Sequence, residues 1–170
     1  VVGVKYAIAL NSCSAALHLS MIAIDIKKDD EVITTPFTFV ATALAIIHCG
    51  GKPIFVDIDP KTFNIDPHKI ERAITKKTKA VMPVHYGGQP VDLDKILKIA
   101  RKYKLYVVED AAHAIGAKYK GSNIGAVGDL TCFSFHPVKN ITTGDGGAIV
   151  TNNKKLAEKI MVLRVNGIDK

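Results

Sequence analysis

Lys139 has the sequence surroundings of a reactive amine. It follows the apolar run 130–135 and precedes the glycine-rich segment 144–147. Glycines let the backbone approach a bound molecule closely, and a lysine that is partly removed from water becomes an amine nucleophile, able to form a Schiff base with a carbonyl compound. Taken alone, a lysine at such a position more often extends its ammonium group from a strand end into solvent. A second motif favours the reactive interpretation.

That second motif is an acidic pair after another apolar strand. The run 105–108 is typical of a buried parallel strand, and Glu109 and Asp110 follow at its carboxyl end, where ligands bind in open α/β sheets. If a pyridoxal ring were attached to Lys139, a carboxylate such as Asp110 would keep its ring nitrogen protonated, so that the ring accepts electrons. His113 could donate a hydrogen bond to the ring's phenolic oxygen. Each residue also has a structural explanation, because Asp110 could cap a helix and a lone histidine is more often structural.

The segment after the first expected strand suits a phosphate. Residues 4–10 are strand-like, and the chain then turns through residues 11–13 into an apolar, helix-forming run over residues 14–24. Free N–H groups at the start of such a helix attract a phosphate. A serine that caps the helix without any ligand fits the same residues, so both interpretations stay open.

Strand-like and helix-forming segments alternate along the chain, with helices expected over 67–74 and 91–103. This alternation predicts an α/β fold in which a mostly parallel, seven-stranded sheet has helices on both faces. The expected strands are residues 4–10, 31–34, 53–57, 80–84, 105–109, 130–135 and 148–151. A dinucleotide-binding oxidoreductase would share this fold, but the G-x-G-x-x-G turn that it needs after the first strand is missing, since Asn11-Ser12-Cys13-Ser14 stands there. A P-loop is missing for the same reason.

Six segments, in this order, resemble motifs of the DegT/StrS family of nucleotide-sugar aminotransferases, which use pyridoxal phosphate (PLP) on the fold type I aminotransferase scaffold. The resemblance covers essentially the whole chain. The segments are residues 11–17, 35–42, 53–59 and 83–90, the Glu109-Asp110 motif and the Lys139 motif.

The resemblance implies a catalytic centre. Lys139 would be the PLP-bound lysine, Asp110 the partner of the ring nitrogen, and His113, where many members carry Gln, the contact of the ring oxygen. The implied reaction is a two-half transamination. An amino donor, expected to be glutamate, passes its amino group to the cofactor, which then aminates a nucleotide-linked keto sugar for amino-sugar or polysaccharide biosynthesis. The freed amine of Lys139 would move the proton between substrate carbon and cofactor.

The resemblance also implies how the rest of the cofactor is held. Phe39 would stack on the ring, while Ser134 and the backbone of Ser14 and Ala15 would hold the phosphate. The residues allow another interpretation of Phe39, because an aromatic residue at the start of the apolar run 39–47 is more often part of a core helix. Cys13 is a departure, since family members usually have Gly followed by Thr or Asn at positions 13 and 14.

Two other functions share part of this pattern. Some relatives in the family replace the lysine with histidine and dehydrate sugars, so a PLP- or pyridoxamine phosphate (PMP)-dependent dehydratase is one alternative. A non-catalytic binding or regulatory scaffold is the other. Because Lys139, Asp110 and His113 are all present, transamination is the favoured function. The resemblance further implies a homodimer in which each active site is completed by the partner subunit.

The composition predicts one domain. The 170 residues, 48% of them apolar, can bury one hydrophobic core, and the apolar stretches are interrupted well before membrane-spanning length. The chain opens on Val1 without a signal peptide, so we expect a fragment: a PLP-binding large domain over residues 1–170, with an amino-terminal segment and a carboxy-terminal small domain missing. The scattered cysteines, Cys13, Cys49 and Cys132, favour a cytoplasmic compartment, and no metal-ligand spacing occurs.

The net charge of +7 raises the possibility of a nucleic-acid partner. The lysines, however, lie in short runs such as Lys27-Lys28-Asp29-Asp30 and Lys76-Lys77-Thr78-Lys79, mixed with acids or loop residues and without interleaved aromatic residues. We therefore expect a solvated basic surface, with neither a nucleic acid nor a membrane as partner.

Overall fold

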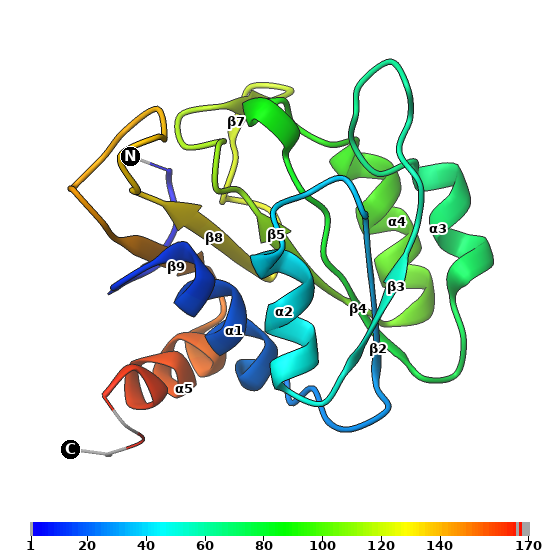
Figure 1. Ribbon diagram of the computed structural model, residues 1–170, viewed down its shortest axis with the longest axis horizontal. Coiled ribbons are helices and arrows are strands. Elements are labelled where there is room, and N and C mark those ends of the chain that lie inside the picture. Colours follow the sequence, from blue (N-terminus) through cyan, green and yellow to red (C-terminus); the bar gives the residue numbers. More distant parts are fainter. Residues whose placement is uncertain (1, 166, 168–170) are drawn as a thin grey trace.

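The computed structural model describes residues 2–165 and 167. This part of the chain forms a seven-stranded sheet with helices on both faces (Figure 1), as the sequence predicts. A separate two-stranded hairpin consists of β6 (Lys118–Tyr119) and β7 (Ser122–Asn123). The strands of the large sheet are β1 (Tyr6–Leu10), β2 (Glu31–Thr34), β3 (Lys52–Phe55), β4 (Thr78–Val81), β5 (Tyr106–Asp110), β8 (Leu130–Ser134) and β9 (Gly147–Thr151).

The sheet is mostly parallel, with one strand reversed. Its order is β1-β9-β8-β5-β4-β2-β3, and β9 is antiparallel to both of its neighbours. β5 pairs in parallel with β4 and β8, and β2 pairs in parallel with β3 and β4. The expected strand 80–84 ends earlier, at Val81, and only an isolated bridge between Val84 and Asp110 continues the pairing. Pro83 explains the interruption, because proline has no N–H for the ladder.

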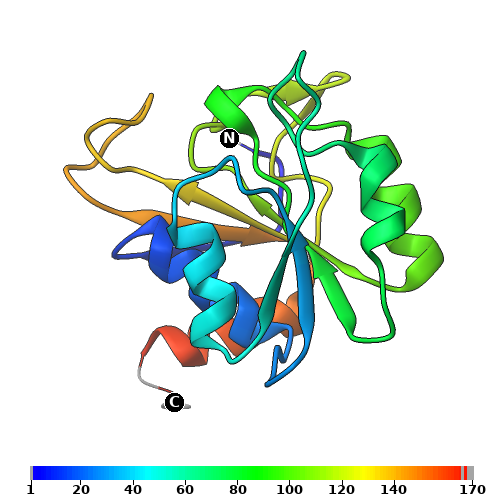
Figure 2. The same cartoon turned by 45° about the vertical axis from the view of Figure 1, so that its right-hand side comes forward.

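Helices cover the two faces in two groups. The helices are α1 (Cys13–Ala23), α2 (Ala41–His48), α3 (Pro67–Ala73), α4 (Leu93–Tyr103) and α5 (Lys154–Arg164), with a short 3₁₀ turn over Tyr86–Gly88. α1, α2 and α5 lie together on one face, and α3 and α4 lie on the other (Figures 1 and 2). Among the described residues, no helix is both long and apolar enough to cross a membrane.

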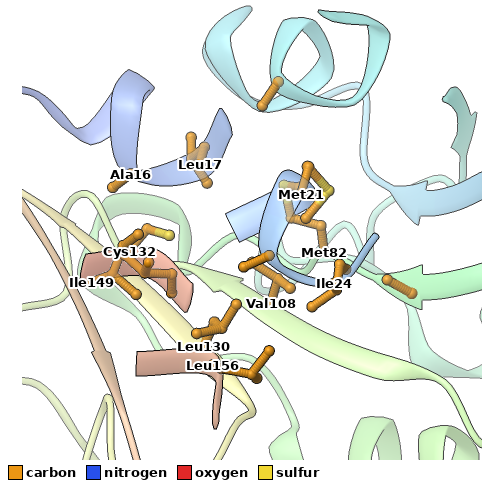
Figure 3. Packing of buried hydrophobic residues seen from close by; sticks show 14 of the residues in the cluster. Ala16, Leu17, Met21, Ile24, Met82, Val108, Leu130, Cys132, Ile149 and Leu156 are labelled. Carbon is orange, nitrogen blue, oxygen red and sulfur yellow. The ribbon is translucent and has the colours of Figure 1, made fainter. Parts of the chain in front are cut away.

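Successive residues of the central strands alternate between the two cores. In β5, Val108 belongs to the core beneath α1, whereas Val107 belongs to the core beneath α4. Figure 3 shows the first core, where Leu17 and Met21 of α1 lie over the sheet residues Val108 and Leu130. All four of these side chains are buried. This packing on both faces holds the carboxyl ends of β5 and β8 in place, and the candidate site lies there.

Candidate active site

A pocket of about 300 Å³ collects residues from distant parts of the chain. Its walls come from the start of α1, the loop before α2, the segment after β4, the end of β5, and the end of β8 with the loop that follows. The predicted site residues that line the pocket are Ser14, Phe39, Asp110, His113, Ser134 and Lys139. The seventh predicted residue, Ala15, lies instead in the wall of a second pocket, between α1 and the end of α5.

Lys139 and His113 are in direct contact in the pocket. The distance from Lys139 Nζ to His113 Nε2 is 2.7 Å. Burial lowers the pKa of the His113 imidazole and the Lys139 ammonium lowers it further, against an opposing effect of Asp110. The neutral imidazole therefore accepts a hydrogen bond from the ammonium. Asn140 fixes the lysine loop, because its side-chain amide donates to the carbonyl of Ile115 at 2.9 Å.

Asp110 is buried, with 4% of its surface exposed, and both of its carboxyl oxygens accept hydrogen bonds. Thr42 Oγ1 donates to Oδ2 at 2.7 Å, and the N–H of Ala112 donates to Oδ1 at 3.2 Å. The backbone of Asp110 is bonded as well, to the carbonyl of Pro83 and the N–H of His85. Asp110 therefore closes a turn onto Ala112 rather than capping a helix, because residues 111–117 contain no helix.

The start of α1 uses one of the N–H groups considered for a phosphate. The helix begins at Cys13, one residue earlier than expected, and Ser12 caps it by accepting the N–H of Ala15 at 3.1 Å. The N–H groups of Cys13 and Ser14 lie in the first turn, where a helix offers no acceptor of its own. Cys13 does not disturb this turn, because its side chain packs into the core, where burial raises the pKa of the thiol.

Phe39 lies outside the core. It precedes α2, and 74% of its surface is exposed, so the alternative of a core-helix residue does not hold for it. Val40 and Ile47 on the same segment are 56% and 50% exposed. The pocket thus has an apolar rim that continues onto the outer surface of α2.

The structure adds residues that the sequence analysis gave no role. Thr42 contacts Asp110; its signals in the sequence are its place at the end of the family-like segment 35–42 and its hydroxyl group within the apolar run 39–47. His85 and Glu109 form a fully buried pair, in which Nε2 lies 2.8 Å from Glu109 Oε2 and the N–H of Val91 donates to Nδ1. Among residues 2–165 and 167, no group of three or more His, Cys, Asp or Glu side chains is arranged to hold a metal ion.

Solved structures of similar proteins share this fold. The DesV protein of S. venezuelae, solved in complex with a ketimine intermediate, is 39% identical with a TM-score of 0.97, and the match covers 99% of this chain and 46% of that chain. The ntda protein of Bacillus subtilis, solved with bound cofactor PMP, is 41% identical with a TM-score of 0.91, and the match covers 99% of this chain and 39% of that chain.

The sequence comparisons give the family. Residues 1–170 match the DegT/DnrJ/EryC1/StrS aminotransferase family, and the chain belongs to that family, which confirms the resemblance. The spore coat polysaccharide biosynthesis protein SpsC of Bacillus subtilis is 53% identical over 99% of this chain and 43% of its own length. The GDP-perosamine synthase of Caulobacter vibrioides is 50% identical over 98% of this chain and 45% of its own length. The chain therefore spans less than half the length of these curated relatives.

Proposed function

We propose that this chain is the cofactor-binding part of a PLP-dependent aminotransferase that transfers an amino group to a nucleotide-linked keto sugar. One observation carries the proposal: the Lys139 amine, the buried Asp110 carboxylate and the Ser134 hydroxyl group line one pocket, next to the first turn of α1. Two similar proteins, a GDP-perosamine synthase and a spore coat polysaccharide biosynthesis protein, support a sugar substrate.

The groups that line the pocket fit the parts of PLP. Lys139 supplies an amine for the aldehyde, Asp110 an anion for the ring nitrogen, and His113 a group for the ring oxygen. Ser134 and the first-turn N–H of Ser14 suit a phosphate. The cofactor, when bound, supplies an electron sink for reactions at the substrate carbon next to nitrogen. The pocket volume of about 300 Å³ is at the lower end of the usual range for small-molecule sites.

In this proposal, Lys139 would transfer the proton and His113 would position the Lys139 amine. Among the residues that the structure describes, Lys139 is the only lysine of the pocket lining, so it would both attach the cofactor and move a proton to or from the substrate carbon. His113 would hold the Lys139 amine in place until then, since it already contacts Nζ. Ala15 remains a predicted phosphate contact, although its N–H would first have to leave Ser12.

The proposal includes a glutamate donor, a cytoplasmic location and a homodimer. The exposed apolar residues Phe39, which lines the pocket, and Val40 and Ile47, which continue along the same segment, support a partner subunit there. The free cysteines Cys13, Cys49 and Cys132 support a reducing compartment. Residues 1–170 would form the large domain, and a small domain would belong to the remaining length that the relatives have.

The deciding experiment locates the cofactor lysine. The full-length protein is incubated with PLP and reduced with borohydride, and its peptides are mapped by mass spectrometry. We expect the pyridoxyl label on Lys139 and its loss in Lys139→Arg. Lys120→Arg is the matched control, because the Lys120 side chain pairs with Asp94 outside the pocket. Labelling of another lysine, or of none, would overturn the proposal.

A further inference from the structure

Thr42 lies between Asp110 and a second threonine. It is fully buried in the first turn of α2, and its Oγ1 is 2.7 Å from Asp110 Oδ2 and 2.7 Å from Thr38 Oγ1. Thr38 itself lines the pocket. The three side chains therefore form a continuous hydrogen-bonded row from the loop before α2 to the end of β5.

The direction of the hydrogen bonds in this row depends on the charge of Asp110. Thr42 has one hydroxyl hydrogen, and an ionised carboxylate can only accept. With Asp110 ionised, Thr42 must donate to Oδ2, so that Thr38 must donate to Thr42. If Oδ2 were protonated, Asp110 would donate to Thr42, and the Thr42 hydroxyl group could then donate to Thr38. Both arrangements satisfy the two threonines, but a hydrogen bond to an ionised acceptor is stronger than one between neutral groups, so the row favours the ionised form of Asp110.

Asp110 needs such support because it is buried. Removal from water favours a neutral carboxyl group, whereas hydrogen bonds to its charged form favour the anion. Thr42 supplies one bond to Oδ2 and Ala112 one to Oδ1. Because the two donors bind different oxygens, they also fix the plane of the carboxylate. Each oxygen keeps acceptor capacity for a further donor from the pocket.

We propose that Thr42 is a positioning residue that, with Thr38 behind it, keeps Asp110 ionised and correctly oriented, and so keeps a shared proton on the cofactor's ring nitrogen rather than on the carboxyl group. The effect on the ring nitrogen rests on the proposed function. The effect on Asp110 does not, because the hydrogen bonds are present in the chain without a cofactor.

The test compares variants of the full-length protein. Thr42→Val keeps the shape and removes the donor, Thr42→Ser keeps the donor, and Thr38→Val removes only the second hydroxyl group. Without cofactor, isotope-edited infrared spectra recorded as the pH is lowered should show the carboxylic acid C=O band of Asp110 appearing at a higher pH in Thr42→Val than in the unmodified protein, with a smaller change in Thr38→Val and none in Thr42→Ser. Asp110→Asn assigns the band.

With cofactor, the nitrogen-15 NMR signal of labelled PLP should move toward the unprotonated position in Thr42→Val. We expect kcat to fall about ten- to a hundredfold, with the KM for the amino donor nearly unchanged, because a lost hydrogen bond to a charged group corresponds to a factor in that range. Thr42→Ser should restore both values.

The measurements without and with cofactor distinguish the proposed role of Thr42 from the proposed function of the protein. If Thr42→Val shows the infrared and nitrogen-15 spectra of the unmodified protein, the role of Thr42 is wrong even though PLP binds. If no pyridoxyl lysine forms in any variant, the proposed function fails, and the infrared arm alone decides about Thr42. Should Thr42→Val not fold, Thr38→Val decides, and an unchanged Asp110 band in that variant overturns the proposal.

Discussion

Removal of the His85 side chain should destabilise the protein strongly. His85 is 1% exposed and Glu109 is fully buried. The N–H of Val91 donates to Nδ1, so the ring must carry its hydrogen on Nε2 and donate it to Glu109. Glu109 Oε1 accepts two further bonds, from Thr131 Oγ1 and the N–H of Gly128. The pair thus connects the segment after β4 to β5 and β8.

His85→Ala removes a donor to a buried carboxylate and an acceptor of a buried N–H. The first loss costs about 1.5–3 kcal/mol and the second about 1–3 kcal/mol, so we expect a loss of about 2.5–6 kcal/mol. His68→Ala is the matched control. Its side chain is exposed and only its backbone N–H takes part in a capping bond, so the change should stay within about 0.5 kcal/mol.

Urea unfolding of the full-length protein and hydrogen exchange at Val91 measure this loss. If the Val91 N–H exchanges through an opening that also breaks the His85–Glu109 pair, a loss of about 3 kcal/mol in the free energy of that opening should speed its exchange about a hundredfold. Glu109→Gln separates the hydrogen bond from the cavity, because it removes no heavy atom but replaces one accepting oxygen with an NH2 group, which then faces either the His85 Nε2–H or the Gly128 N–H. If His85→Ala behaves like His68→Ala, the inferred tautomer and the importance of the pair are both wrong.

Two further predictions concern the pocket. Asp110→Asn should leave PLP bound but slow turnover, because a neutral amide cannot hold the ring nitrogen protonated; single-turnover kinetics measure this, and an unchanged rate would refute the role of Asp110. The NMR titration of His113 should have its midpoint below 6.5 and move upward in Lys139→Met, since burial and the ammonium both lower the pKa; a midpoint above 6.5 would contradict the contact. Because the neutral form is favoured in the fold, His113 should reduce stability as the pH falls through 6.5.

The sequence predicted the sheet, and it placed Asp110 and Lys139 near one edge of that sheet, because both follow from local patterns. Apolar runs mark the buried strands, and the carboxyl ends of parallel strands meet at one edge of a sheet. Asp110 at the end of β5 and Lys139 after β8 therefore had to come close. The reversed direction of β9 was not specified by its apolar residues, because an apolar run reads the same for either direction.

The supporting residues could not be predicted, because their roles arise from contacts between distant segments. Thr42 and Asp110 are 68 positions apart, and no spacing rule connects a hydroxyl group on a helix to a carboxylate on a strand. His85 and Glu109 lie on opposite sides of α4 in sequence. Their pairing depends on the parallel register of β4 and β5, which the strand patterns leave open.

The start of α1 brings together two interpretations that the sequence left as alternatives. Ser12 is the N-cap, and its side chain accepts the N–H of Ala15, whereas the N–H groups of Cys13 and Ser14, two residues that line the pocket, have no acceptor within the helix. Gly147 allows this arrangement, because a Cβ there would collide with the carbonyl group of Ser12. Gly147, one of the glycines in the segment 144–147, thus admits the backbone at the start of α1. A helix cap and a phosphate site are thus compatible in one turn, since they draw on different N–H groups of the same helix.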